Sequence, residues 1–463
     1  MESTMTRGSH IVSSDNIRAA FSAAMSAMYR TEVPAYGELI SLVADVNART
    51  LAASLDETDT LDRISEERHG AIRLGTEAEL AMMRRVFAVM GMFPVGYYDL
   101  SEAGVPVHST AFRPVDDAAL KISPFRVFTS LLRLDLIEDA GLRDEAEEIL
   151  AARRIFSPAA VALVEKAEFE GGLAEPDVAS FISEILKTFR WNEQASISHE
   201  RYSRFHRVHP LIADVVSFKG PHINHLTPRT LDIDAVQGLM PARGITPKAV
   251  IEGPPSRNCP ILLRQTSFKA LEEPVYFPDG DGTLRPGSHT ARFGEVEQRG
   301  VALTPKGRAL YDRLLNEARA NIRPAADGSN ADDYYLALET AFQAFPDDWD
   351  DIRRRGLGYF TYRLGRVIDG GAHDKPDLET LIETGAILFD PIVYEDFLPV
   401  SAAGIFQSNL GDAAAQSLAA SPNQKRFEQA LGAAVLDEFK HYADIEKASI
   451  AHCMAALNAE VVR

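Results

Sequence analysis

The sequence predicts an α+β fold: an open β-barrel made from two βαβββ-type modules, with large helical additions at both ends and between the modules. The segments 61–137 and 216–305 share one layout, in which a histidine precedes a strand, a polar residue begins a helix, and a Gly/Pro-rich return leads to further strands. The other segments place apolar residues at helical spacing. Two modules of this kind can pair into one barrel with a site between them.

The N-terminal segment and the first module have clear element signals. Residues 1–60 are predicted to form a helical cap in which Pro34 separates two helices. The first module begins with a short strand at 71–74, after which Thr76 and Glu79 form a capping-box pattern that starts a helix. The stretches HSTAFRPV and FRVFTSLLRLDLI then have the composition of strands. The expected order is strand, helix, strands.

The rest of the chain alternates helical segments with the second module. Residues 138–215 are charged and helical in pattern, and we expect a helical insertion. In the second module, the Asp-Gly pairs of FPDGDGTLRPGS predict a hairpin turn. Residues 306–463 are predicted to be mainly helical, with a long closing helix from Gln424 to Leu457 and a loop near 390–405 that can form a pocket wall.

The composition fits one elaborate domain or a few modules. The chain has 463 residues, of which 46% are hydrophobic, enough to bury a large core. Its two cysteines, Cys259 and Cys453, are too few for a disulfide framework, and the polar start MESTMTRGSHIVSSDN lacks the pattern of a secretory leader. We therefore expect a protein of the reducing cytoplasm.

The charge and hydropathy argue against two classes of partner. A formal net charge of -19 repels a phosphate backbone, so nucleic acid is not expected. The most apolar run, residues 81–98, is interrupted by Arg84, Arg85 and Pro94, so a membrane span is not expected either. A small anionic substrate remains compatible, because one buried arginine overrides the global charge at contact distance. The sequence leaves the oligomeric state open.

Two histidines stand at matching places in the two modules. A redox-metal site of the facial type needs two neutral imidazoles and one carboxylate. His69 begins the strand of the first module, and His225 begins the strand of the second. Side chains alternate along a strand, so His222 and His225 cannot both point into one barrel, and we choose His225. Both chosen histidines can also be read as ordinary strand-edge residues, and His222 stays open as a replacement.

The carboxylate is expected from the stretch RFGEVEQRG. Glu295 and Glu297 are two residues apart and therefore face the same side of an apolar-flanked strand, where a buried acid needs a partner. Two other readings are possible. The strand can face solvent at one end, or Glu297 can pair with Arg292 or Arg299.

A helical di-iron site is a rival interpretation. Glu-x-x-His spacings occur at Glu66 to His69 and at Glu438 to His441. Acids make up 67 of the 463 residues, so twelve histidines give roughly 1.7 such pairs by chance. Chance explains both pairs.

Four motifs together resemble a known family: RHGAIRLGT, INHLTPR, RFGEVEQRGVALTPKGRALYDRLL and YEDFLPVSAAGIFQSNLG. They are similar to the 2-oxoadipate dioxygenase/decarboxylase family, the hydroxyglutarate synthases of bacterial lysine catabolism, over nearly the whole chain. The resemblance implies a vicinal-oxygen-chelate-like barrel with helical additions. It also implies an Fe(II) enzyme that uses O2 to convert 2-oxoadipate, a 2-oxo dicarboxylic acid, to 2-hydroxyglutarate and CO2.

The resemblance assigns roles to individual residues. It implies the metal ligands His69, His225 and Glu295, with Glu297 as the fallback, and Arg73 as the catalytic-site arginine that binds a substrate carboxylate. Val400 and Ser401 match the family's pocket wall. The substrate-binding set is therefore His69, Arg73, His225, Glu295, Val400 and Ser401. The first acid is preferred because the strand also resembles the FxExxQR strand of hydroxyphenylpyruvate dioxygenases.

Strand geometry is compatible with these roles. His69, Ala71 and Arg73 face one way, and four residues of strand separate the first from the last by roughly 13 Å at the backbone. A six-carbon diacid can bridge that gap between a metal and a planar guanidinium. Two alternatives remain: an oxygen-independent metal isomerase or lyase on the same barrel, and a non-catalytic 2-oxo acid binding protein. Chain-length preference and product stereochemistry stay open.

Overall fold

The computed structural model describes residues 10–53, 61–66, 68–325, 327–365, 377–398 and 422–460. The chain divides into two compact units. The first unit comprises Met1–Ile251, Gln265–Glu297 and Phe397–Leu436, and the second comprises Glu252–Arg264, Gln298–Asp396 and Asp437–Arg463. The five-part division expected from the sequence stays a prediction.

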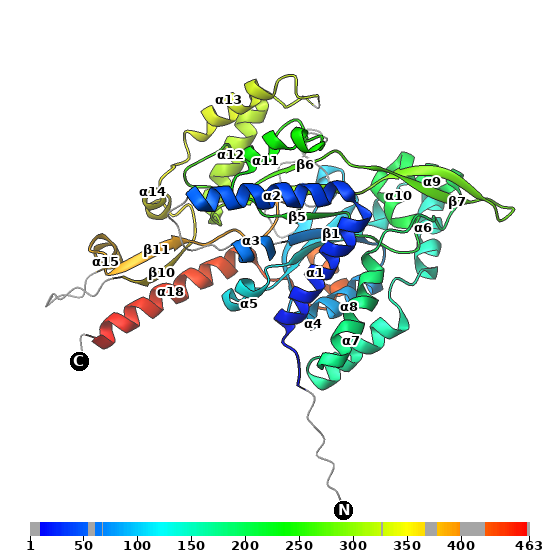
Figure 1. Ribbon diagram of the computed structural model, residues 1–463, viewed down its shortest axis with the longest axis horizontal. Helices are drawn as coiled ribbons and strands as arrows, with labels where there is room; N and C mark the ends of the chain where they lie inside the picture. The colour runs from blue at the N-terminus through cyan, green and yellow to red at the C-terminus, as the bar shows by residue number, and fades with distance from the viewer. Residues whose placement is uncertain are drawn as a thin grey trace, which may run out of the picture. The chain divides into compact units, whose positions relative to one another are not determined.

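A seven-stranded sheet joins the two predicted modules. Its order is β2-β3-β4-β1-β5-β9-β6. The strands are β1 (Arg68–Leu74), β2 (Phe93–Asp99), β3 (Val107–Arg113), β4 (Arg126–Leu132), β5 (His225–Pro228), β6 (Leu263–Ser267) and β9 (Phe293–Arg299). β1 pairs with β4 in parallel, and β5 pairs with β9 in parallel. The antiparallel pair β1 and β5, labelled in Figure 1, connects the halves. Each half therefore uses the same pairing of its first and last strands.

The sheet confirms the predicted fold class. Within the described residues it stays open, with β2 and β6 at its edges. The first half follows the order β1, α4 (Glu77–Val89), β2, β3 and β4, with the short α5 (Asp117–Ile122) before the last strand. This is the βαβββ order, and the α+β, vicinal-oxygen-chelate-like pairing of two modules is confirmed. Thr76 and Glu79 form the predicted capping box of α4.

Strand β2 was not predicted from the sequence. Its stretch FPVGYYD contains Pro94 and Gly96, which read as a Gly/Pro-rich return. β2 is an edge strand, where proline is tolerated. Gly96 has φ 71° and lies at the register shift between Val95 and Tyr97, so it forms a bulge rather than a turn.

The second half has a shorter helix and a separate hairpin. Asp232 caps α11 (Ile233–Leu239), which has 7 residues. β7 (Glu272–Pro278) and β8 (Leu284–Thr290) form the antiparallel hairpin that the Asp-Gly pairs predicted. The chain then enters β9 beside β5, so the hairpin and β9 belong to different sheets.

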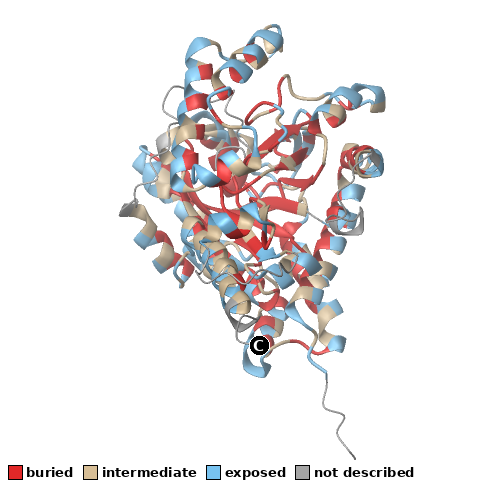
Figure 2. Cartoon of the chain, turned by 90° about the vertical axis from the view of Figure 1, so that its left-hand side faces the viewer, coloured by how far each residue is buried: buried red, intermediate tan, exposed pale blue. Residues whose placement is uncertain are grey.

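Helices surround the sheet of the first unit. They are α1 (Ser14–Glu32), α2 (Pro34–Ala53), α3 (Leu61–Glu66), α6 (Ala140–Ala152), α7 (Pro158–Glu170), α8 (Glu175–Phe189), α9 (His199–Val208), α10 (Pro210–Val216) and α17 (Pro422–Leu431), with 3-10 turns η1 (Ser101–Ala103), η2 (Leu134–Leu136) and η3 (Pro241–Arg243). The two predicted N-terminal helices are confirmed, with Pro34 at the start of α2. The hydroxyl of Tyr29 in α1 shares its one proton between the carbonyl oxygens of Asn224 and Phe293, at 3.0 and 2.7 Å, and so joins α1 to the second half of the sheet. The strands of the seven-stranded sheet are mostly buried, and the outer faces of the helices are exposed (Figure 2).

The second unit contains helices and a two-stranded sheet. Its elements are α12 (Pro305–Asn321), α13 (Ala331–Phe342), α14 (Trp349–Arg354), β10 (Phe360–Leu364), α15 (Leu378–Glu383), β11 (Ile387–Pro391) and α18 (Glu438–Glu460). β10 and β11 pair antiparallel. Among the described residues, no helix is both long enough and apolar enough to cross a membrane.

The predicted closing helix from Gln424 to Leu457 is wrong. The chain forms two helices there, α17 and α18. Gly432 adopts φ 72°, and its N–H donates to the carbonyl of Glu428 at 2.9 Å, which ends α17. The apolar residues of LGAAVLDEF continue the helical spacing across this break, so the pattern hid the glycine stop.

Candidate metal centre and its neighbourhood

Three side chains predicted as metal ligands converge in the first unit. His69 is the second residue of β1, His225 is the first residue of β5, and Glu295 is the third residue of β9. These strands are neighbours in the sheet. One possible ligand atom from each residue lies within 4.8 Å of the others, and all three residues are fully buried. The structure therefore brings the predicted set together, and the ligand role itself stays a prediction.

The residues present fit a bound cation. Glu295 Oε2 lies 3.2 Å from His69 Nε2 and 3.8 Å from His225 Nε2. Among the described residues, neither ring nitrogen of His225 nor Oε1 of Glu295 has a hydrogen-bond partner. Buried polar atoms without partners are costly, and two imidazoles with one carboxylate are a set that suits a redox metal. A cation between them would satisfy these atoms.

Two further side chains orient Glu295. Thr227 Oγ1 donates to Glu295 Oε2 at 2.9 Å, and Gln265 Nε2 donates to the same oxygen at 3.3 Å. Thr227 lies opposite His69 in the β1–β5 register. The pairing of these two strands therefore positions the candidate ligand His69 and also the hydroxyl that donates to the candidate ligand Glu295. Sequence reasoning did not select either residue, because each contact depends on strand pairing.

Glu297 contacts the other side of His69. Its Oε2 lies 3.3 Å from His69 Nδ1, and its Oε1 forms an ion pair with Arg126. The sequence reading that paired Glu297 with Arg292 or Arg299 did not include this arginine. Arg126 Nη2 contacts the same ring nitrogen at 3.3 Å, and charged groups beside the second nitrogen help to orient a metal-binding histidine. The geometry favours Glu295 as ligand and Glu297 as the residue that orients His69.

Arg126 was missed by sequence reasoning. It is the first residue of β4, is fully buried, and lies opposite His69 in the parallel β1–β4 register. An arginine in a strand whose other residues are apolar or small is an informative signal, because arginine is seldom fully buried without a partner. The sequence did not show which partner it had.

Burial sets the protonation of the candidate ligands. It lowers the pKa of His225 well below the usual value, and the positive charge of nearby Arg73 acts in the same direction. The His225 imidazole is therefore neutral, as a metal ligand must be. Burial also raises the pKa of Glu295, although the hydrogen bond with His69 opposes this. A bound cation would favour the Glu295 carboxylate.

His222 lies outside the three-residue cluster. Its Nε2 is 3.7 Å from Asp214 Oδ1, and its ring packs edge-on against Trp191, with 4.7 Å between centroids. Burial lowers the pKa of His222 to about 3. The cluster of possible metal ligands contains His225 and not His222. The choice between the two histidines thus has geometric support.

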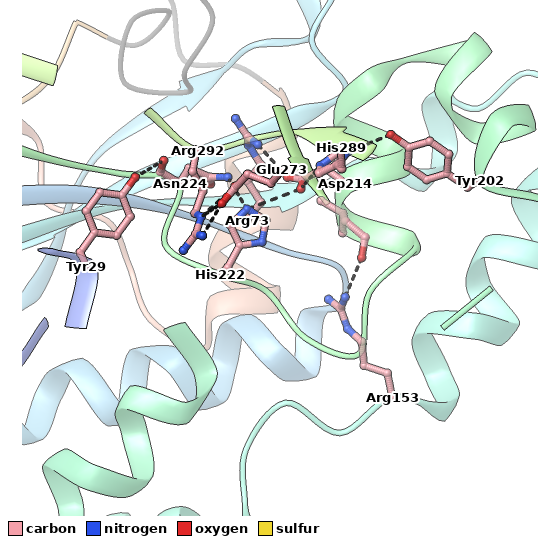
Figure 3. A network of polar contacts seen from close by, with 11 residues as sticks. Tyr29, Arg73, Arg153, Tyr202, Asp214, His222, Asn224, Glu273, His289 and Arg292 are labelled. Carbon is pink, nitrogen blue, oxygen red and sulfur yellow. Dashed lines mark hydrogen bonds and ion pairs between the residues drawn. The ribbon is translucent and has the colours of Figure 1, made fainter. Parts of the chain in front are cut away.

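Arg73 points into a buried polar cluster (Figure 3). It lies on β1 four residues after His69, on the same face of the strand. Its Nη1 donates to Asp214 Oδ2 at 2.7 Å. Burial opposes ionisation of Asp214, yet the hydrogen bond from His289 and the positive charge of Arg73 lower the pKa of Asp214. Asp214 belongs to α10 and was missed, although an acid within the apolar run LIADVV is an informative signal.

Val400 and Ser401 lie outside the described residues, so their predicted role stays a prediction. The described chain before them reaches the metal cluster. The ring of Phe397 packs edge-on against His69, with 4.8 Å between centroids, and Arg126 lies 4.6 Å from the centre of the same ring. The segment that leads toward the predicted pocket wall therefore begins beside His69.

Comparisons with known proteins agree with the resemblance seen in the motifs. Residues 21–409 match the sequence profile of the 2-oxoadipate dioxygenase/decarboxylase family. The 2-oxoadipate dioxygenase/decarboxylase of Pseudomonas putida is 56% identical over 456 residues, covering 96% of this chain and 98% of that protein. The protein of the same name from Escherichia coli is 54% identical over 451 residues, covering 96% of this chain and 98% of that protein.

A solved structure is also similar to this chain over nearly its whole length. The crystal structure of hydroxyglutarate synthase from Pseudomonas putida, in complex with 2-oxoadipate, matches with a TM-score of 0.87 and 54% identity. The match covers 97% of this chain and 99% of that chain. The fold, the buried cluster and the extent of these matches lead to one conclusion: the chain belongs to the 2-oxoadipate dioxygenase/decarboxylase family.

Proposed function

We propose that this chain is an iron(II)-dependent dioxygenase that decarboxylates and hydroxylates 2-oxoadipate, giving 2-hydroxyglutarate and CO2. The observation that supports it most is the buried set of His69, His225 and Glu295, with Arg73 on the same strand face as His69. Relatives of this name match nearly the whole chain at 56% and 54% identity. The substrate and reaction are those named for these relatives and for the hydroxyglutarate synthase solved with 2-oxoadipate.

Iron is the proposed cofactor because of the donor set. Two histidines and one carboxylate are the ligands of non-haem Fe(II) oxygenases. When bound, iron supplies coordination positions for the 2-oxo acid end of the substrate and for O2, and the redox chemistry of the reaction. Glu297 Oε2 and Arg126 Nη2 each lie 3.3 Å from His69 Nδ1, and together they hold the imidazole with Nε2 toward Glu295. Thr227 and Gln265 orient the carboxylate of Glu295.

Arg73 is proposed to bind the far carboxylate of the substrate. The four strand residues from His69 to Arg73 span roughly 13 Å at the backbone, and inward-pointing side chains at both ends shorten the gap. That span fits a six-carbon diacid whose 2-oxo acid end lies at the metal centre. The planar guanidinium offers two parallel N–H donors to a carboxylate, a geometry that lysine lacks.

Aromatic rings around the cluster exclude water. Phe397 packs against His69, and Phe293 stacks on His225 with 4.7 Å between centroids. A dry site strengthens the interactions of charged groups and limits side reactions of oxygen-derived species. The chain thus provides binding, orientation and shielding around the reacting carbon atoms.

The proposal also covers the cellular compartment of the enzyme and the metabolic pathway in which it acts. Both cysteines, Cys259 and Cys453, are free and buried, which suits a reducing compartment, and we place the enzyme in the cytoplasm. We also assign it to lysine catabolism, as the family resemblance implies. Its substrates would then be a 2-oxo dicarboxylic acid and O2.

Labelled oxygen gas tests the reaction. One 2-oxoadipate and one O2 give one 2-hydroxyglutarate and one CO2, so both oxygen atoms of O2 enter the five-carbon product. The iron-loaded protein should give 2-hydroxyglutarate with two labelled oxygens when exchange with water is excluded. A single label would contradict this route. Turnover without O2 would indicate an isomerase or lyase, and tight substrate binding without CO2 release would indicate a binding protein.

A further inference from the structure

Asp214 connects Arg73 to a chain of buried hydrogen bonds (Figure 3). Arg73 Nη1 donates to Asp214 Oδ2 at 2.7 Å. On the other carboxylate oxygen, His289 Nε2 donates to Oδ1 at 2.9 Å, and Tyr202 donates its hydroxyl to His289 Nδ1 at 2.8 Å. Every donor in this chain has an acceptor when His289 is neutral. Three different segments, β1, α10 and β8, are joined in this way, with α9 at the end.

The chain restricts the position of the Asp214 carboxylate. Both oxygens are engaged, and the Asp214 side chain is only 5% exposed. Trp191 stacks parallel to His289 with 6.1 Å between centroids and an interplanar angle of 5°. Arg153 Nη1 donates to the carbonyl of Val215 at 2.6 Å and so fixes the backbone beside Asp214. A charge held this firmly limits the rotamers of the arginine that it binds.

Asn224 adds a second contact to the same nitrogen. With its amide oriented so that Oδ1 faces the cluster, Asn224 accepts from Arg73 Nη1 at 3.0 Å and from His222 Nε2 at 3.2 Å. Arg73 Nη1 thus lies between two acceptors, one on α10 and one in the loop that precedes β5. One end of the guanidinium is therefore fixed by the protein rather than by substrate.

We propose that Asp214 is a positioning residue that fixes the guanidinium of Arg73, and thereby selects 2-oxo diacids of six carbons over shorter and longer ones. This inference rests on the proposed function, because it assumes that Arg73 binds the far carboxylate. A metal at His69, His225 and Glu295 and a fixed guanidinium define two ends of the substrate. A diacid one carbon shorter or longer can then bind well either at the metal or at the guanidinium, but not at both. A shift in the position of a carboxylate is costly for a bidentate contact with arginine.

The charges favour a role for Asp214 in positioning Arg73, rather than competition between Asp214 and the substrate carboxylate for Arg73. The Arg73 side chain is only 12% exposed, and a guanidinium that has lost most of its water is costly without a counter-ion, so Asp214 stabilises Arg73 before substrate arrives. Guanidinium has five N–H donors, and a carboxylate on Nη1 is compatible with a second carboxylate on another edge. Asp214 therefore need not leave when the substrate binds.

Asp214→Asn tests the inference with a matched set of substrates. The variant keeps the shape of the side chain and removes its charge. Steady-state kinetics should be measured with 2-oxoglutarate, 2-oxoadipate, 2-oxopimelate and 2-oxohexanoate, the last of which lacks the far carboxylate. For 2-oxoadipate we expect kcat/KM to fall about tenfold or more, mainly through KM. The preference for six carbons over five and seven should fall with it, and activity on 2-oxohexanoate should change little.

Glu273→Gln is the matched control. Glu273 is buried in the same neighbourhood, but it accepts from Arg292 Nε at 2.9 and 2.8 Å. Its neutralisation should leave the chain-length preference unchanged. If Asp214→Asn does not fold, the preference is measured in Tyr202→Phe, which removes only the hydroxyl donated to His289 and should lower the preference in the same direction.

Several outcomes would overturn the inference. They are an unchanged chain-length preference in Asp214→Asn or its substitute, a lower KM for 2-oxoadipate, and an equal loss on 2-oxohexanoate or in Glu273→Gln. A lower KM would mean that Asp214 competes with substrate for Arg73. The proposed function fails separately, if the wild-type iron-loaded protein does not turn over 2-oxoadipate with O2.

Discussion

Glu297 Oε2 lies 3.3 Å from Nδ1 of His69, the ring nitrogen opposite the one that faces Glu295. The two acids of β9 thus contact the two nitrogens of one imidazole, although both face the same side of the strand. Their environments differ, because Glu297 also pairs with Arg126, whereas Glu295 accepts from Thr227 and Gln265. Two acids in one strand are therefore expected to have different roles.

Iron binding should separate these two roles. Glu295→Ala removes a proposed ligand and should abolish stoichiometric binding of iron(II), measured by metal content after anaerobic loading and desalting. Glu297→Gln should keep one iron per chain, with affinity lower by about 10–100-fold, because it changes a residue that contacts His69 and Arg126 and leaves the three proposed ligands in place. If Glu297→Gln loses iron and Glu295→Ala retains it, Glu297 is the ligand.

Replacing Arg73 should affect substrate use and not iron. Arg73→Lys keeps a positive charge near Asp214 but loses the planar pair of donors. We expect normal iron content and a fall in kcat/KM for 2-oxoadipate of about 100-fold for Arg73→Leu, with a smaller fall for Arg73→Lys. Far-UV circular dichroism controls for folding. An unchanged kcat/KM in Arg73→Leu would rule out the carboxylate-binding role.

The stability of the protein should fall in mild acid, in part because of His108. Burial, together with the positive charge of Arg133, lowers the pKa of His108 to about 4. Between about pH 6.5, the usual pKa of an unfolded-chain histidine, and pH 4, the unfolded chain binds a proton that the folded chain does not. His108 therefore contributes stability at neutral pH that is lost as the pH falls through this window.

Urea unfolding of His108→Gln tests whether His108 makes the protein less stable as the pH falls. From pH 7 to pH 5, the unfolding free energy of the wild type should fall by about 2 kcal/mol more than that of His108→Gln. The comparison uses the change with pH, since the substitution also alters the 3.3 Å contact with Tyr97 at every pH. His206 is exposed, so His206→Gln should behave like the wild type. Equal pH dependence in wild type and His108→Gln would contradict the prediction.

The parts of the site that could be predicted are those that one strand pattern determines. His69 and His225 stand at matching positions in two segments of similar layout, so the pattern alone paired them. Alternation placed Glu295 and Glu297 on one side of a strand, and the structure has both beside His69. The pattern could not decide which of Glu295 and Glu297 is the metal ligand, because that choice depends on the contacts that each side chain makes.

The parts that could not be predicted depend on contacts between distant segments. Arg126 reaches His69 through the parallel pairing of β1 with β4, and Asp214 reaches Arg73 from α10, 141 residues along the chain. Local patterns contain no information on register between strands or on which helix covers which strand. Both residues were nevertheless visible as charged residues in apolar runs, a signal of burial with a partner that the sequence did not identify.

Gly70 should control iron binding without contacting iron. It lies between His69 and Ala71 in β1, where a Cβ atom would come within 2.6 Å of Ile223 Cδ1 and 2.9 Å of the carbonyl oxygen of His225. Contacts this short force the two strands apart, and backbone atoms of β5 yield less easily than a flexible side chain. Gly70→Ala should therefore separate His69 from His225 and weaken iron binding by about tenfold or more, since metal sites require closely fixed ligands. Isothermal titration with iron(II) under anaerobic conditions measures the loss. At Gly238 in α11, a Cβ atom would meet no described atom within 4 Å, so Gly238→Ala is the matched control and should bind iron like the wild type. If Gly70→Ala binds iron with wild-type affinity, the close approach of β1 to β5 is not what sets the spacing of the two histidines.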